Sequence, residues 1–103
     1  MKTVIFSTIL WLPIMPKYYV ETGTLQEIVS SSSPFNACVG AVHKASNRYL
    51  ETGESSVTLG DSFIVNEKGF PSNRKPFTLD TANDTMLSPA RIIEAYENDR
   101  HGQ

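Results

Sequence analysis

Hydrophobic residues at helical spacing predict the clearest element of the chain, an amphipathic helix over residues 34–48. Ser33 is a favourable N-cap residue, and Pro34 fits the first helical position. Gly40 lowers helix stability by about 1 kcal/mol relative to alanine, so we expect it to allow close packing against a strand. One face of the helix carries the residues that recur at i, i+3, i+4 and i+7, which are Phe35, Cys38, Val39 and Val42.

The same start signal recurs in "SPARIIEAYENDRHG" and predicts a second helix near the C-terminus. Ser88 is its expected N-cap, and Pro89 is its first residue. Arg100 and His101 place positive charge near the C-terminal end of the helix, where the helix dipole favours it. The apolar stripe of this helix consists of Pro89, Ile92, Ile93 and Tyr96.

The apolar stretch at residues 3–15 is rich in β-branched and aromatic side chains and predicts a strand, with a buried helix as the alternative. As a strand it carries apolar residues on both faces, with Ile5, Ile9 and Trp11 on one of them. A strand of this kind needs cover on both sides. We expect that cover to come from a loop or from a second subunit.

Shorter segments complete the predicted sheet. Residues 17–22 form the second strand, whereas the capping-box pair Thr24 and Glu27 predicts a short helix over residues 25–29. The stretch "VTLGDSFIVNEKGF" predicts two further strands, because a Gly-Asp turn separates its apolar runs. A last short strand is expected in "KPFTLDT".

Together these elements predict one α+β domain over residues 1–103, in the order β-β-α-β-β-α. Its two layers are a largely antiparallel sheet of about four strands and two amphipathic helices on one face of that sheet. The short helix at residues 25–29 would be an addition to this order.

The start of the chain resembles a targeting segment, since Lys2 precedes an apolar run. No small-residue cleavage site follows Met15, and the run is shorter than the about 20 residues that span a membrane. The lone cysteine, Cys38, fits a reducing compartment. We therefore expect a cytoplasmic protein with no membrane partner.

Charge and motif content make several function classes unlikely on physical grounds. Nine Lys and Arg residues against eleven Asp and Glu residues give a net charge of −2, with no basic cluster suited to nucleic acid.

Cys38 and His43 lie about 140° apart around a helix axis, so they do not form a nucleophile–base pair. His101 has no ligand partners nearby in sequence. We expect no metal site and no cofactor, and we favour a non-enzymatic protein, with an enzyme left open for a domain that binds a small ligand.

One polar stripe of the helix over residues 34–48 is the candidate ligand site. Asn36, His43 and Asn47 share this stripe with Gly40, and Lys44 and Arg48 flank it. Such a set suits an anion, a nucleotide or the backbone of a partner. An ordinary solvated helix face is the alternative explanation.

The sequence therefore predicts a small non-enzymatic protein-interaction module that self-associates through its apolar N-terminal strand, with Ile5, Ile9 and Trp11 in the interface. Its partner would be another protein or a second copy of itself. Two alternatives stay open. One is a small-ligand or nucleotide-binding domain that uses the polar helix stripe, and the other is a phage or mobile-element protein that inhibits a host factor.

Overall fold

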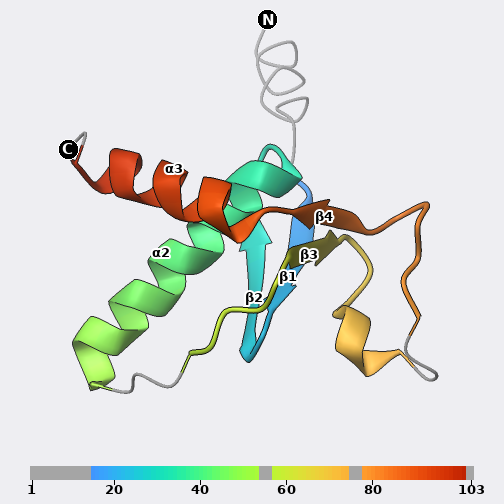
Figure 1. Ribbon diagram of the computed structural model, residues 1–103, viewed down its shortest axis with the longest axis horizontal. Coiled ribbons are helices and arrows are strands. Elements are labelled where there is room, and N and C mark those ends of the chain that lie inside the picture. The colour runs from blue at the N-terminus through green and yellow to red at the C-terminus, as the bar shows by residue number, and fades with distance from the viewer. Residues whose placement is uncertain (1–14, 54–56, 75–77, 102–103) are drawn as a thin grey trace, which may run out of the picture.

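The computed structural model describes residues 15–53, 57–74 and 78–101, which form one antiparallel sheet and two helices (Figure 1). The predicted α+β class and the largely antiparallel sheet of four strands with two helices are confirmed for these residues. The order β-β-α-β-β-α is also observed, but β2 and β4 take the places of strands predicted elsewhere in the chain. The strands lie side by side in the order β2-β1-β3-β4. The element bounds are β1 Lys17–Thr22, β2 Leu25–Ser30, α2 Pro34–Thr52, β3 Phe63–Asn66, the 3-10 helix η1 Pro71–Asn73, β4 Thr85–Leu87 and α3 Pro89–His101. The expected strand at residues 3–15 falls almost wholly outside the described residues.

Strands β1 and β2 form a tight hairpin, so the short helix predicted over residues 25–29 is wrong. Burial along β2 alternates with period two, with Leu25, Glu27 and Val29 facing inward. Thr24 does not act as a helix cap, because its hydroxyl oxygen accepts a hydrogen bond from the backbone N–H of Thr58 at 2.8 Å. Pairing with β1 thus overrides the local capping signal.

Helix α2 begins as the sequence predicts. The Ser33 hydroxyl accepts the backbone N–H of Asn36 at 3.1 Å, and Pro34 is the first helical residue. The helix continues four residues beyond the predicted end, to Thr52. It stops at Gly53, which has φ 74° and donates its N–H to the Tyr49 carbonyl.

The buried face of α2 is built from small residues. Ala37, Cys38 and Ala41 are fully buried, whereas the expected apolar residues Phe35, Val39 and Val42 are only partly buried at the margin of the core. A Cβ atom on Gly40 would lie 3.0 Å from Val29 Cγ1, which confirms that this glycine permits close packing of the helix against β2. The core unites α2 with the inner face of the sheet and with α3 through Tyr18, Val20, Val29, Phe63, Val65, Ala37, Cys38, Ala41 and Ile92.

The outer face of the sheet is covered in its middle by the segment that contains η1. The Phe70 ring packs edge-on against Tyr19, with ring centroids 5.2 Å apart, and Pro71 is buried. The backbone N–H of Ser72 donates to Glu21 Oε1 at 3.0 Å. The segment that contains η1 therefore covers the outer face of β1, whereas the cover expected for residues 3–15 concerns residues outside the described part.

Two other strand predictions fail. Residues 57–59 are not a strand, because they cross the turn end of the β1–β2 hairpin, where the Thr58 carbonyl accepts the Thr24 N–H at 2.9 Å. Residues 78–80 are not a strand either, and residues 75–77 of the same predicted segment lie outside the described part. The fourth strand is instead Thr85–Leu87, which pairs with β3.

Two glycines provide a matched test of the hairpin contact. Gly53 has φ 74° with open space around its Cα, so Gly53→Ala should cost about 1 kcal/mol for the left-handed backbone alone. Gly23 has φ 54°, and a Cβ there would lie 1.9 Å from the Thr58 carbonyl oxygen. Gly23→Ala should therefore cost about 2 kcal/mol more than Gly53→Ala in urea unfolding. Equal losses in the two variants would contradict the described contact between the hairpin and residues 57–60.

Candidate functional site

The residues of the polar stripe predicted from the sequence, and the cations beside it, do not face one common site, because α2 packs against both α3 and β2. His43 faces α3, where its Nε2 lies 2.8 Å from Asp99 Oδ2 and its ring packs edge-on against Tyr96. Lys44 turns to the other side and donates from Nζ to the Ile28 carbonyl of β2 at 2.8 Å. His43 therefore contacts α3, whereas Lys44 bonds to β2.

Arg48 also turns to β2, where it pairs with Glu27. The Glu27 side chain is only 8% exposed, because it lies on the inner face of the strand beneath α2. A carboxylate in this position requires a charged partner, since an unpaired buried charge is costly. Arg48 therefore has a structural role in holding α2 on β2.

Of the remaining stripe residues, Asn36 lies in the first turn of α2 and Asn47 lies in its C-terminal half. Asn36 donates from Nδ2 to the Ser32 hydroxyl at 3.0 Å, and Asn47 is exposed. A shallow pocket of about 350 Å³ includes Asn36, His43 and Asp99 among its lining residues. The structure thus brings Asn36 and His43 together and leaves Lys44 and Arg48 bound to β2. The expected interface residues Ile5, Ile9 and Trp11 lie outside the described residues.

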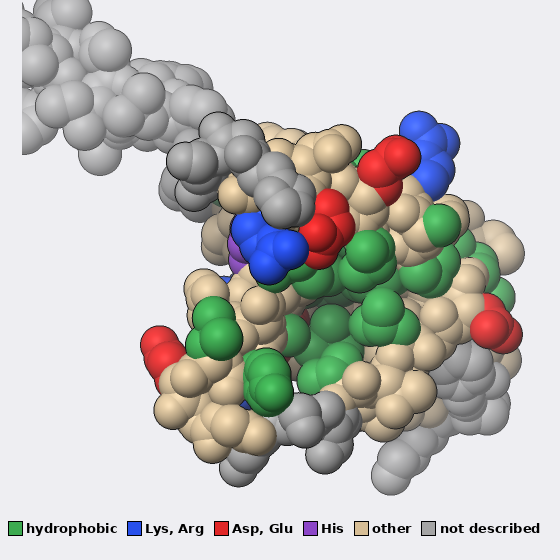
Figure 2. All heavy atoms as spheres, turned by 60° about the vertical axis from the view of Figure 1, so that its left-hand side comes forward, with side chains coloured by type: hydrophobic (Ala, Val, Ile, Leu, Met, Phe, Trp, Pro, Cys, Tyr) green, Lys and Arg blue, Asp and Glu red, His purple; other side chains and the backbone are tan. Residues whose placement is uncertain are grey.

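A larger hollow lies on another side of α2, and its lining is mostly apolar (Figure 2). Its volume is about 450 Å³, within the range of about 300–1,000 Å³ that ligand pockets occupy. None of its lining residues is charged. We call it the apolar groove, and it is lined by Leu25, Val42, Ala45, Ser46, Tyr49, Val57, Leu59, Ile93 and Tyr96.

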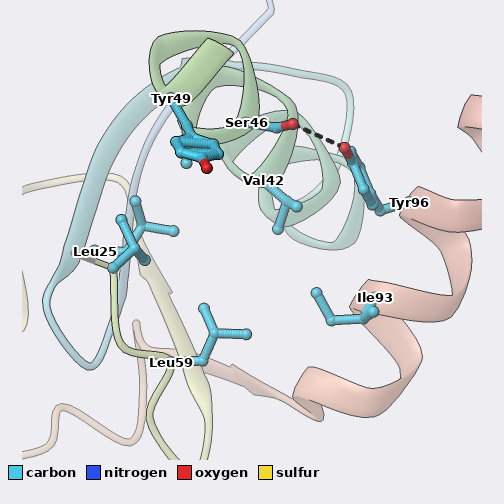
Figure 3. Close-up of a pocket in the computed structure, with 9 residues that line it drawn as sticks. Leu25, Val42, Ser46, Tyr49, Leu59, Ile93 and Tyr96 are labelled. Carbon is cyan, nitrogen blue, oxygen red and sulfur yellow. Dashed lines mark hydrogen bonds between the residues drawn. The ribbon is translucent and has the colours of Figure 1, made fainter. Parts of the chain in front are cut away.

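Four segments that are distant in sequence build the walls of the apolar groove (Figure 3). The second half of α2 forms one wall and α3 forms another, and a hydrogen bond of 3.0 Å from the Tyr96 hydroxyl to Ser46 joins them. Leu25 lies at the start of β2, and Leu59 reaches the groove from the segment that the Thr24–Thr58 bonds hold against the hairpin.

The side chains at the mouth of the groove are half exposed. Tyr49 is 49% exposed, Val57 45% and Leu59 41%. Sequence reasoning missed this site because it assigned Leu25 to a helix and Val57 to a strand. The sequence does show that Tyr49, seven residues after Val42, extends the apolar face of the helix, but it gives no signal for the other walls of the groove.

A second polar cluster fixes the segment between β3 and β4. The Asp84 side chain is 2% exposed and pairs with Arg74 through both carboxylate oxygens. Asn66 Nδ2 and the backbone N–H of Asp80 donate to the same carboxylate, at 2.8 and 2.7 Å. The Arg74 guanidinium holds the pKa of the Asp84 carboxyl well below its usual range, and the N–H donors of Asp80 and Asn66 lower it further. Every carboxylate oxygen is engaged within the fold, so this cluster is structural.

Cys38 is a buried thiol with no nucleophilic role. Burial raises its pKa to about 12, which keeps it protonated and unreactive. The described residues contain no group of three or more His, Cys, Asp or Glu side chains placed to hold a metal ion. Within the described part of the chain, no helix combines the length and the apolar character needed to cross a bilayer.

Comparison of the chain with protein-family models, with curated proteins and with solved structures finds no match. The description of the site therefore rests on the geometry of this chain alone.

The lowered pKa of Asp84 predicts acid sensitivity. A carboxyl whose pKa is lower in the folded than in the unfolded state stabilises the fold above about pH 4, and this contribution is lost as the pH falls toward the folded-state pKa. Asp84→Asn should lower the free energy of unfolding by about 2 kcal/mol at pH 7. It should also reduce the loss of stability between pH 6 and pH 3, measured by urea unfolding. Asp61→Asn is the exposed control, and identical pH slopes for both variants would contradict the assignment.

Proposed function

We propose that the protein is a small non-enzymatic interaction module that docks an apolar segment of a partner protein in the apolar groove. The observation that carries this proposal is the groove itself, an uncharged hollow of about 450 Å³ whose mouth is framed by half-exposed Tyr49, Val57 and Leu59. Contiguous exposed apolar surface on a small domain is typical of protein-interaction sites.

The chemistry of the lining favours a peptide segment over a polar metabolite. The polar groups of the groove are the backbone and the hydroxyls of Ser46, Tyr49 and Tyr96, and two of these hydroxyls already bond to each other. A phosphate or carboxylate ligand would find no cation among the lining residues. Leucine, isoleucine or aromatic side chains of a partner would instead gain free energy by leaving water.

Ligand binding by the polar stripe of α2 receives less support. Lys44 and Arg48, the two cations that an anionic ligand would need, bond to β2. His43 faces Asp99, a carboxylate that would repel an anion. Self-association through Ile5, Ile9 and Trp11 stays a prediction.

A peptide library selected against the full-length protein tests the proposal. Selected peptides should be rich in large apolar side chains, and their affinity, measured by fluorescence anisotropy, should fall at least ten-fold in Leu59→Asp. Leu79→Asp is the matched control, because Leu79 is 45% exposed, close to the 41% of Leu59, and lies outside the groove. Peptides that bind both variants equally well, with both variants folded by circular dichroism, would contradict the groove as the docking site.

A further inference from the structure

We propose that the partner segment that docks in the apolar groove is an amphipathic α-helix. This inference rests on the proposed docking function and names the class of partner for that site. It follows from the described lining residues, through the engagement of their backbone hydrogen-bonding groups, the spacing of their side chains and their lack of charge.

The lining residues offer few free backbone groups to a partner. Six of the nine belong to α2 or α3, where backbone N–H and C=O groups bond within the helix. Leu25 pairs with Thr22 in the β1–β2 hairpin. Among the described lining residues, Val57 and Leu59 alone lie outside helices and strands. Thr58 between them uses both its N–H and its carbonyl to bond with Thr24.

An extended peptide would leave much of its own backbone unpaired in this groove. Strand addition gains its affinity from main-chain hydrogen bonds along an exposed strand edge. Val57 and Leu59 are too few to pair a segment several residues long, and burial of an unpaired N–H or C=O group is costly. A helix bonds its backbone groups internally, so it buries an apolar face without this cost.

The groove side of α2 has the shape that helix packing requires (Figure 3). Val42, Ala45, Ser46 and Tyr49 lie at i, i+3, i+4 and i+7, so they form one stripe about 10 Å long. The two central residues are small and the two outer residues are larger. A large side chain of a partner helix can therefore enter above Ala45 and Ser46, as in the packing of ridges into grooves.

The volume of the groove matches what one helix face presents. A cavity of about 150 Å³ holds one benzene ring. The groove, at about 450 Å³, therefore has room for two or three large apolar side chains. Apolar residues at i, i+4 and i+7 of a partner helix supply this number along the length of the α2 stripe.

Charge complementarity selects the same kind of partner face. None of the lining residues is charged. Beside the groove, the Arg100 guanidinium lies 5.9 Å from the centroid of the Tyr96 ring and pairs with Glu97 at 3.0 Å, so its charge is compensated within α3. The matching partner face is uncharged, and an amphipathic helix provides one while its charged side chains stay in water.

Two matched sets of designed peptides test the helical partner on the full-length protein. Each peptide has about 15 residues, the length at which an alanine-rich helix begins to form in water. Both sets place leucine, isoleucine and phenylalanine on one background of alanine, glutamine, glutamate and lysine. The first set spaces the apolar residues at i, i+4 and i+7, and the second at i, i+2 and i+4. In fluorescence anisotropy the first set should bind at least about ten-fold more tightly.

A proline substitution distinguishes a helical from an extended bound peptide. At a central position on the polar face of a first-set peptide, proline should lower the affinity at least about ten-fold, because it breaks the helix. Alanine at the same position should leave the affinity unchanged. Equal affinities of the proline and alanine peptides would overturn the helical partner, and so would tighter binding by the second set.

The variants Leu59→Asp and Leu79→Asp separate this inference from the docking function on which it rests. First-set peptides should bind at least about ten-fold more weakly to Leu59→Asp than to Leu79→Asp, since only Leu59 lines the groove. If only second-set peptides bind in this Leu59-dependent way, the helical partner is refuted and the docking function stands. If neither set shows Leu59-dependent binding, the docking function itself fails.

Discussion

The close approach of α2 to β2 is the constraint on which the rest of the structure depends. Gly40 brings the helix so near the strand that a Cβ atom at this position would lie 3.0 Å from Val29 Cγ1. At this distance the cations of the helix reach the strand, and Lys44 bonds to the Ile28 carbonyl while Arg48 pairs with the buried Glu27. The same placement turns Val42 and Tyr49 toward α3 and residues 57–59, where they border the apolar groove.

Different segments cover the two faces of the sheet, and polar contacts hold each of these segments in place. The inner face is closed by α2 and by Ile92 of α3. The outer face is closed over β1 by Phe70 and Pro71, and the Ser72 N–H bonded to Glu21 holds this segment in place. Asp84 and Arg74 then tie the returning chain to β3 through Asn66. These anchors explain why a modest core keeps four short strands in register.

The sequence predicted the parts of the fold that local signals determine. Both Ser-Pro helix starts, the role of Gly40 and strand 17–22 follow from capping, helix propensity and alternation. Strand β2 was misassigned because Thr24 and Glu27 match a capping box, and only pairing with β1 and burial beneath Arg48 make the segment extended. The groove was not predictable, because Leu25, Leu59 and Ile93 meet only through tertiary packing.

Lys44 and Arg48 of α2 bond to β2, and we infer that these contacts hold the helix on the sheet. A double-mutant cycle on Glu27 and Arg48, followed by urea unfolding at pH 7, tests this inference most directly. Arg48→Met should lower the free energy of unfolding by about 2 kcal/mol, because Glu27 is left buried and unpaired. Adding Glu27→Met should restore most of this loss. A loss below about 0.5 kcal/mol for Arg48→Met, as for an exposed ion pair, would contradict the account and return Arg48 to the candidate ligand site.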